Sequence, residues 1–134
     1  MASAAVFNAV KARLAANWSR CPIIALNSIT EAPEPAWVAV LFPIATEEQK
    51  SIGAPGQNIF REAGVIRLVL AIPRGAEIAP WLAWMDELRS LFRAKHFEQV
   101  RTYEASPAVL DDRNDDGPLW LLTSAVEYDA DFLG

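Results

Sequence analysis

Cysteine and histidine are nearly absent from this sequence of 134 residues, which contains one of each, Cys21 and His96. Zinc sites built from these residues need three or four ligands, so the composition excludes a site of that kind. A single thiol cannot form a disulfide within the chain. A single imidazole with no recognisable nucleophile motif beside it is more often structural than catalytic. We therefore predict no catalytic residue, and we expect that the protein is not an enzyme.

Excess positive charge and long apolar runs are missing as well. The 12 Lys and Arg residues stand against 17 Asp and Glu residues, for a net charge of −5. Because nucleic-acid binding draws much of its free energy from Lys and Arg beside phosphates, we expect no direct, sequence-specific contact with nucleic acid. The longest apolar run, residues 36–45, is about half of the roughly 20 residues that a membrane helix needs. We expect a soluble protein with no membrane partner.

Apolar and aromatic residues are abundant instead. Apolar residues make up 52% of the chain, which includes five Trp and six Phe. Such a composition is typical of a folded domain and not of a disordered segment. The length suits one hydrophobic core and is too short for a second. We therefore expect residues 1–134 to form a single domain.

Two segments, residues 3–18 and 77–94, have the periodicity of amphipathic helices. Glu77 near the start of the second segment, and Arg93 and Lys95 near its end, carry the charges that the helix dipole favours. The apolar stripes are Val6, Phe7, Val10, Leu14 and Trp18 in the first segment, and Ile78, Trp81, Leu82, Met85, Leu88, Leu91 and Phe92 in the second.

Five segments are predicted to be strands: residues 22–26, 36–44, 64–73, 97–104 and 118–128. Strands that follow one another without a helix between them pair antiparallel. The predicted fold class is α+β, with two helices packed on one face of a mainly antiparallel, mixed sheet of four to five strands. The residues expected on one face of the two central segments are Val38, Val40, Phe42 and Ile44, and Ile66, Leu68, Leu70 and Ile72.

A polar segment, residues 46–62, separates the two central strands and contains Gly53, Pro55 and Gly56. It is roughly three times as long as the usual connection between elements. Connections of this length in a small domain tend to be functional or disordered. We therefore expect a long loop between the two central strands.

Residues 112–117 match the opening of a calcium-binding loop, with Asp112, Asn114 and Asp116 at alternating positions before Gly117. The match then fails, because Thr123 stands where a bidentate glutamate is needed. A run of Asp, Asn and Gly between strands is also ordinary turn chemistry. We predict no metal site and keep the three oxygen-bearing residues as weak calcium candidates.

Charge is distributed unevenly along the chain. The first 30 residues contain three cations and no acid, whereas residues 104–134 contain eight acids and one cation. If the two ends lie on different sides of the domain, copies would attract head to tail, and contacts of that kind can close into rings. Solubilising surface charge explains the pattern at least as well. The cations of the first part are Lys11, Arg13 and Arg20.

Several short motifs follow one another in a particular order along the chain. Their most specific part is Gln49-x-Ser51-Ile52-Gly53-x-x-Gly56, followed by Arg61-x-x-Gly64 and Pro73-x-Gly75. Before it stand Phe7, Leu14, Trp18, Pro22-Ile23, Asn27 and Trp37-Val38-Ala39-Val40, and after it stand Leu82, Leu88, Phe92 and Gly117-x-x-Trp120. In this order of features the sequence resembles the tail-terminator, or tail-completion, proteins of long-tailed bacteriophages, including the minor tail protein U type and prophage-encoded domains of unassigned function.

The resemblance implies a two-helix, mixed-sheet subunit that forms a ring, expected to be a hexamer, on the end of the tail tube. Such a ring halts tube polymerisation and presents a surface to the head side. The implied partners are further copies of the chain, the tail-tube protein and the head–tail connector protein. The implied location is the virion tail, after assembly in the host bacterial cytoplasm. Neither catalysis nor a cofactor is implied.

The long polar segment suits a loop that reaches a neighbouring subunit or the ring lumen. Arg61 and Arg67 flank it, and we expect them to pair with acids of the next subunit. The predicted interface residues are Gln49, Ser51, Ile52, Gly53, Gly56, Arg61 and Arg67.

Two alternatives stay open. One is another small neck or connector protein of the virion, which sequence alone barely separates from a terminator. The other is an enzyme or ligand-binding α+β domain, with a cleft around His96, Asp86 and Tyr103.

Overall fold

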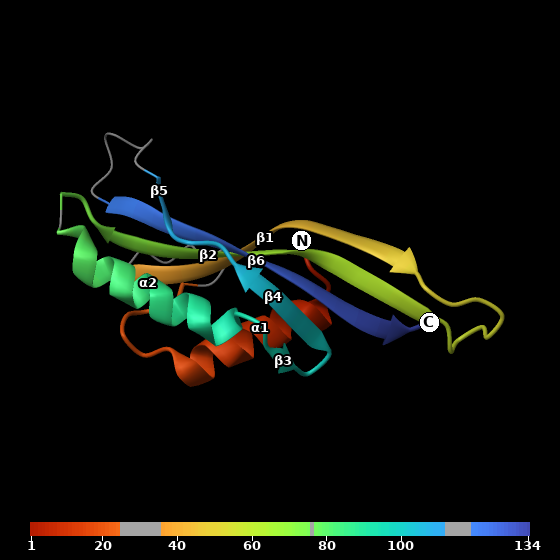
Figure 1. Ribbon diagram of the computed structural model, residues 1–134. Helices are drawn as coiled ribbons and strands as arrows, with labels where there is room; N and C mark the ends of the chain where they lie inside the picture. The colour runs from red at the N-terminus through yellow and green to blue at the C-terminus, as the bar shows by residue number, and fades with distance from the viewer. Residues whose placement is uncertain (25–35, 76, 112–118) are drawn as a thin grey trace.

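The computed structural model describes residues 1–24, 36–75, 77–111 and 119–134 (Figure 1). The described part contains two helices and six strands, in an order that confirms the predicted α+β class. The elements are α1 (Ala4–Asn17), β1 (Trp37–Gln49), β2 (Ile59–Pro73), α2 (Ile78–Phe92), β3 (His96–Phe97), β4 (Val100–Ala105), β5 (Val109–Asp111) and β6 (Leu119–Leu133).

The strands form one sheet in the order β1-β2-β6-β4-β3, with β5 paired to a further stretch of β6. Every pairing between the named strands is antiparallel, as predicted. Among the described residues, the one parallel contact is an isolated bridge between Ile23 and Val38 on the outer side of β1. This bridge is what the described residues retain of the strand predicted at residues 22–26, of which residue 25 onward lies outside the described residues.

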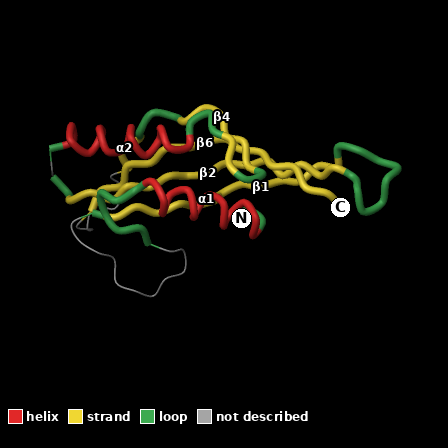
Figure 2. The backbone as a smooth tube through the Cα atoms, turned by 90° about the horizontal axis from the view of Figure 1, so that it is seen from below, coloured by secondary structure: helices red, strands yellow, loops and turns green. Residues whose placement is uncertain are grey.

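Both helices pack on the same face of the sheet, as predicted (Figures 1 and 2). The predicted face of β2 lies entirely in the core, because Ile66, Leu68, Leu70 and Ile72 have no exposed surface. Since side chains alternate along a strand, this face pairs with the inward residues of β6. The core is completed by Val6, Val10 and Leu14 of α1, Met85, Leu88 and Phe92 of α2, and Leu122, Val126 and Tyr128 of β6.

A β-bulge changes the face on which the side chains of β1 lie. The pairing register shifts between Leu41 and Ile44, so that Phe42 and Pro43 together stand opposite one residue of β2. Pro43 has no N–H to donate to a ladder, and proline in a strand is confined to edges and bulges. Beyond the bulge, Ile44 lies on the helix-free face and is 58% exposed. The expectation that Ile44 shares a face with Val38 and Phe42 was therefore wrong.

Nearly half of the segment predicted to be a long loop, residues 46–62, is strand. β1 continues to Gln49 and β2 begins at Ile59, so the loop between them is residues 50–58. Elsewhere the segment predicted at residues 97–104 divides into β3 and β4, which meet at a tight turn where Glu98 has a φ of 52°. The sheet thus has six strands and not four to five, since β5 is also too short to have been recognised from alternation.

Gly64 is required by the close packing of three strands. A Cβ atom built at this position would lie 2.2 Å from the backbone oxygen of Ile44 and 3.0 Å from the Tyr128 ring. The Tyr128 ring occupies the space above the glycine and meets Phe42 edge to face, with 6.4 Å between the ring centroids. The glycine therefore lets the bulge of β1 and the aromatic ring of β6 approach the same point of β2.

We predict that Gly64→Ala lowers the free energy of unfolding by about 3 kcal/mol, the upper part of the range for overpacking, because the obstructing atom belongs to the backbone. Denaturant unfolding followed by tryptophan fluorescence measures the change. Ala125→Ser, at an exposed position of β6, is the matched control and should change the unfolding free energy by less than about 0.5 kcal/mol. Equal stability of the two variants would contradict the packing argument.

Candidate functional site

The end of the sheet beyond the helices forms a projecting arm of three strands (Figure 2). We define the arm as residues 46–63 of β1, β2 and the loop between them, together with residues 129–134 of β6 and the chain end. Residues 59–63 pair with β1 on one side and with β6 on the other. Because three paired strands hold one another where an isolated hairpin is marginal, the arm keeps its shape without a covering layer.

The tip of the arm, residues 50–58, is held by hydrogen bonds to both strands. The Lys50 N–H donates to the Ile59 carbonyl at 2.7 Å. The Ile59 N–H donates to the Ser51 hydroxyl at 2.8 Å, and the Gln49 side-chain amide donates to the Ser51 carbonyl at 2.9 Å. The side chain of Ile52 is left 86% exposed beside these bonds. The tip therefore presents an apolar side chain from an ordered loop.

A tight turn accounts for the proline and glycine of the tip. The Gln57 N–H donates to the Ala54 carbonyl at 2.8 Å, so Pro55 and Gly56 are the two central residues. Gly56 has a φ of 82°, and a type II turn places proline at the first central position and requires a positive φ at the second. Local turn chemistry thus explains the motif without a bound ligand.

The last residue of the chain closes the base of the tip. Asn58 and Gly134 exchange two backbone hydrogen bonds of 2.9 Å. The side-chain oxygen of Asn58 also accepts a bond of 3.2 Å from the Ala54 N–H, and Asn58 is only 9% exposed. β1, β2 and the chain end are consequently tied together at the point where the tip begins.

A buried carboxylate joins the arm to the body. Glu62 is 7% exposed and accepts a hydrogen bond of 2.7 Å from the Tyr128 hydroxyl. It also accepts bonds of 3.2 and 3.4 Å from the backbone N–H of Ser3, at the start of α1. A carboxylate is favoured there, because the N-terminus of a helix carries unpaired N–H groups and the positive end of its dipole.

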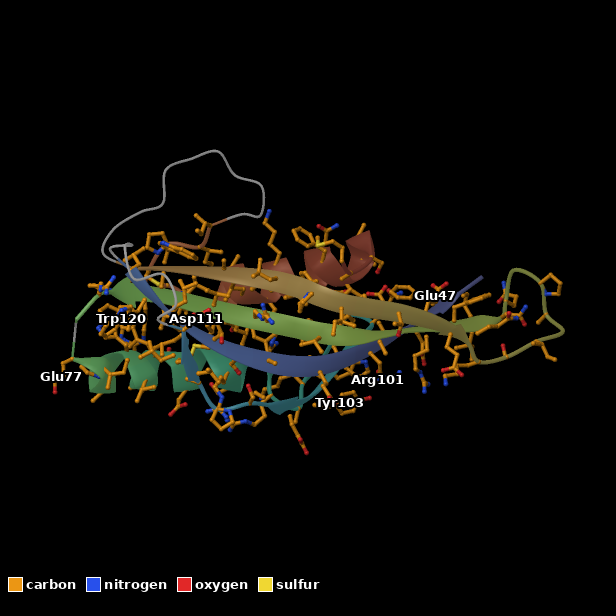
Figure 3. All side chains as sticks on the ribbon, turned by 90° about the horizontal axis from the view of Figure 1, so that it is seen from above. Glu47, Glu77, Arg101, Tyr103, Asp111 and Trp120 are labelled. Carbon is orange, nitrogen blue, oxygen red and sulfur yellow. The ribbon has the colours of Figure 1, made fainter. Side chains whose placement is uncertain are left out.

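Charged side chains form a ladder across the helix-free face of the arm. Arg61 makes two bonds to Asp131, of 2.8 and 3.2 Å, and Arg101 lies 3.2 Å from the same carboxylate. Arg101 also donates to Asp129 at 2.5 Å, and the Tyr103 hydroxyl donates to Asp129 at 2.6 Å (Figure 3). The bond from Arg61 lowers the pKa of Asp131, and the same bond raises the pKa of Arg61.

The predicted interface residues fall into two groups. Gln49, Ser51, Ile52, Gly53 and Gly56 all lie at or beside the tip of the arm. The remaining two, Arg61 and Arg67, lie on the helix-free face, where they stand opposite Asp131 and Ala125 of β6. Arg61 already has an acid of its own subunit as partner, whereas Arg67 is exposed in the middle of the sheet.

The uneven charge of the sequence is partly separated in space. Lys11 is exposed on α1, on the helix side of the sheet. Asp129 and Asp131 alternate with the core residues of β6 and so lie on the opposite face. Much of this charge is paired within the subunit, however, since Arg20 bonds to Glu87 and both aspartates bond to arginines. The acids at residues 112–118 lie outside the described residues.

The three residues of the alternative cleft, His96, Asp86 and Tyr103, do not line a common pocket among the hollows of the described surface; His96 stands opposite Arg101 in the ladder between β3 and β4. Asp86 pairs with Arg89 on α2 at 2.7 Å, and Tyr103 bonds to Asp129. Tyr103 lines two open hollows in the described surface, and neither contains His96 or Asp86. The arrangement therefore provides no nucleophile, base and orienting group in one place, which acid–base catalysis requires.

Other candidate chemistry is equally thin in the described part of the chain, where no cluster of three or more His, Cys, Asp or Glu residues could hold a metal ion. The weak calcium candidates Asp112, Asn114 and Asp116 lie outside the described residues. Burial raises the pKa of the Cys21 thiol, which disfavours the thiolate form that a nucleophile needs. No helix of the described chain is long and apolar enough to cross a membrane.

Comparison with known families matches residues 5–118 to the phage tail terminator protein family. The chain belongs to that family. The match spans both helices and all strands but β6, and confirms the resemblance inferred from the ordered motifs. A search of curated proteins finds no match. Membership makes the chain a structural component of a phage tail, and its family is a structural one.

Several residues of the arm and of its junction with the body were not singled out from the sequence, notably Asn58, Glu62, Asp131 and Tyr128. The sequence did contain a signal for Glu62. It lies four residues before Ile66, and side chains an even number of residues apart in a strand point to the same face, here the core face. Tyr128 lies on the same face of β6 as Leu122 and Val126, and its partner Glu62 is 66 residues away in the sequence. The pairing of Arg61 with Asp131 has no local signal, since it depends on the register between two strands 70 residues apart.

We predict that the alkaline stability of the protein depends on Tyr128. Burial, and then the bond to Glu62, raise the pKa of Tyr128 above the ordinary value of about 10. The folded state therefore keeps this proton at a pH where the unfolded state loses it. The stabilisation is complete below about pH 10 and is lost as the pH rises, at up to about 1.4 kcal/mol per pH unit.

Denaturant unfolding between pH 8 and pH 12 measures this dependence. Tyr128→Phe should be less stable near neutral pH and should lose stability less steeply above pH 10. Tyr103→Phe is the comparison variant: the bond to Asp129 also raises the pKa of Tyr103, but Tyr103 is 44% exposed, so its removal should change the slope less than removal of Tyr128 does. If the unfolding free energy of Tyr128→Phe falls with pH as steeply as that of the wild type, Tyr128 is not the group that holds its proton in the folded state.

Proposed function

We propose that this member of the tail terminator family forms a closed ring, expected to contain six copies, on the end of the tail tube. The ring halts polymerisation of the tube and joins it to the head-side connector protein, after assembly in the host bacterial cytoplasm. The observation that carries the proposal is the arm, which supplies a shaped and ordered contact element outside the core of its own subunit.

Part of the apolar surface of the arm is not buried by its own subunit. The tip of the arm lies beyond the helices (Figure 2), and the side chains of Ile52, Ile59 and Leu133 are 86%, 39% and 64% exposed. Apolar groups stabilise a fold in proportion to the area that they remove from water. An ordered segment with so much exposed apolar surface is consistent with burial against another molecule.

The position of the arm favours a ring over a two-fold dimer. A contact between the arm of one copy and the body of the next joins two different surfaces, and contacts of this type close into rings when the rotation per subunit allows it. A two-fold dimer can use the same two surfaces only if each arm reaches the body of the other copy at the same time. The arm projects from one end of the sheet (Figure 2), so one arm-to-body contact per neighbour is the simpler arrangement.

A second candidate within the same virion is a neck or connector protein, which would also assemble into a ring. The match to the terminator family favours the terminator role. The two roles differ in the tails that form without the protein, because loss of a terminator leaves tube growth unchecked whereas loss of a neck protein leaves tube length normal.

We predict that a phage genome with a deletion of this gene produces tails longer than normal and not joined to heads, as seen by negative-stain electron microscopy. The wild-type chain supplied in trans should restore the length. A shortened arm, with residues 51–58 replaced by the hairpin turn Asn-Gly, should fold but fail to restore it.

Val109→Ser is the matched control for these experiments. Val109 is an exposed residue of β5 at the opposite end of the sheet (Figure 1), and the variant should restore tail length fully. Tails of normal length in the deletion strain would refute the terminator role. Full restoration of tail length by the variant with the shortened arm would show that the arm is not needed for the terminator role.

A further inference from the structure

An apolar groove runs between α1 and the outer edge of β1. It has a volume of about 90 Å³, well above the 10–15 Å³ or so that a single water requires. A hydrocarbon group placed against such an apolar lining removes apolar surface from water on both partners. The residues that line it include Phe7, Val10, Leu14, Ile23, Val40 and Phe42.

The arm carries a side chain suited to such a groove. Ile52 is 86% exposed, more than any other large apolar residue of the described chain. The bonds of Ser51 to Gln49 and Ile59 hold the loop on either side of it. Because the loop is already ordered, its binding costs little conformational entropy. The Ile52 side chain is thus already exposed and held in position before the subunit binds another molecule.

One subunit cannot bring these two features together. Six residues of β1 lie between Phe42, which lines the groove, and Gln49, at the start of the tip. At about 3.3 Å per residue, this stretch of strand is roughly 20 Å long. The hydrogen-bonded ladder between β1 and β2 prevents the tip from folding back. If an Ile52 side chain fills the groove, it must therefore come from a second copy of the chain.

Pairing of sheet edges is a less suitable contact. Pro43 removes one donor from the outer edge of β1, and the bulge there bends the strand. Glu47 and Glu48 are exposed on the part of this edge that belongs to the arm. Proline, bulges and charges are the features by which edge strands avoid pairing with another chain. The side chains of the tip are therefore better suited than the strand edge to contact another copy of the chain.

Charge favours the same pairing of surfaces. Lys11 lies at the groove, with its ammonium group 6.0 Å from the centre of the Phe7 ring, and forms no ion pair with the described residues. Glu47 is exposed on the arm and has no ion-pair partner among the described residues either. The groove thus presents an unpaired cation, and the arm an unpaired anion.

We propose that Ile52 of one subunit inserts into the groove between α1 and β1 of the next copy, with Glu47 facing Lys11 across the contact. The proposal rests on the proposed ring and names the surfaces that close it. Repetition of one tip-to-groove contact around the axis joins all subunits by the same interface.

Disulfide cross-linking in assembled tails tests this contact directly. In a Cys21→Ala background, Ile52→Cys/Lys11→Cys should give a ladder of covalent oligomers on a non-reducing gel of purified tails. Ile52→Cys/Ala83→Cys is the matched control, because Ala83 is exposed on α2 and does not line the groove. The control pair should give no ladder.

The outcomes separate this contact from the proposed function. A ladder in the control pair, or in neither pair, overturns the tip-to-groove contact even if the tails contain a ring. Tails of the deletion strain that have normal length overturn the terminator role itself. Free protein in solution, examined in parallel, shows whether the cross-link requires the tube.

Substitutions test the two parts of the contact separately. Ile52→Ser should weaken recruitment of the chain to tail tubes roughly 10-fold or more, the scale of burying one aliphatic side chain, whereas Val109→Ser should not. Lys11→Glu and Glu47→Lys should each weaken it about 2- to 5-fold, as expected for an exposed ion pair. Recovery in the double variant Lys11→Glu/Glu47→Lys supports the pairing, and equal or greater loss in the double variant overturns it.

Discussion

Fifteen consecutive residue pairs join β2 to β6 without a register shift, from Ile59 with Leu133 to Pro73 with Leu119. The register of this ladder is determined in the body, where a slip of one residue would turn Ile66 and Val126 away from the helices. The arm has no core of its own to select a register. It inherits the alignment chosen by the body, and the ion pair of Arg61 with Asp131 and the exposure of Ile52 follow from that alignment. The packing of the two helices therefore controls a surface that neither helix covers.

The junction of body and arm contains a buried carboxylate, whereas most of the core is apolar. Glu62 occupies the position where the core face of β2 runs out, and a buried carboxylate is costly unless it is well hydrogen-bonded. Tyr128 and the backbone of Ser3 supply those bonds. Because the second donor belongs to the start of α1, the same contact aligns the helix with the base of the arm. Gly64, two residues along, leaves room for the Tyr128 ring that reaches the carboxylate.

The sequence predicted the helices, the α+β class and the inward face of β2, because periodic burial leaves a local pattern in each of these segments. It did not predict the arm as a sheet. Thr46 to Gln49 are exposed on both faces, so they show no alternation, and their strand structure depends on β6 at the far end of the chain. The tip was recognised as unusual because Gly53, Pro55 and Gly56 have local turn preferences. The bulge at Pro43 and the partner of Arg61 depend on pairing between strands that are distant in the sequence, so no local sequence pattern predicts them.

The three-stranded construction of the arm restricts how its length can change. A residue added to β1 alone, or to β2 alone, would turn every side chain beyond it to the other face and would leave β6 without a matching pair. A longer or shorter arm that keeps its faces requires two residues to be added or removed in each of three segments. Reach is therefore difficult to alter by single insertions, whereas the side chains of the tip can vary freely between the same two strand ends. Variation among arms of this design should accordingly concentrate in what the tip presents and not in how far it extends.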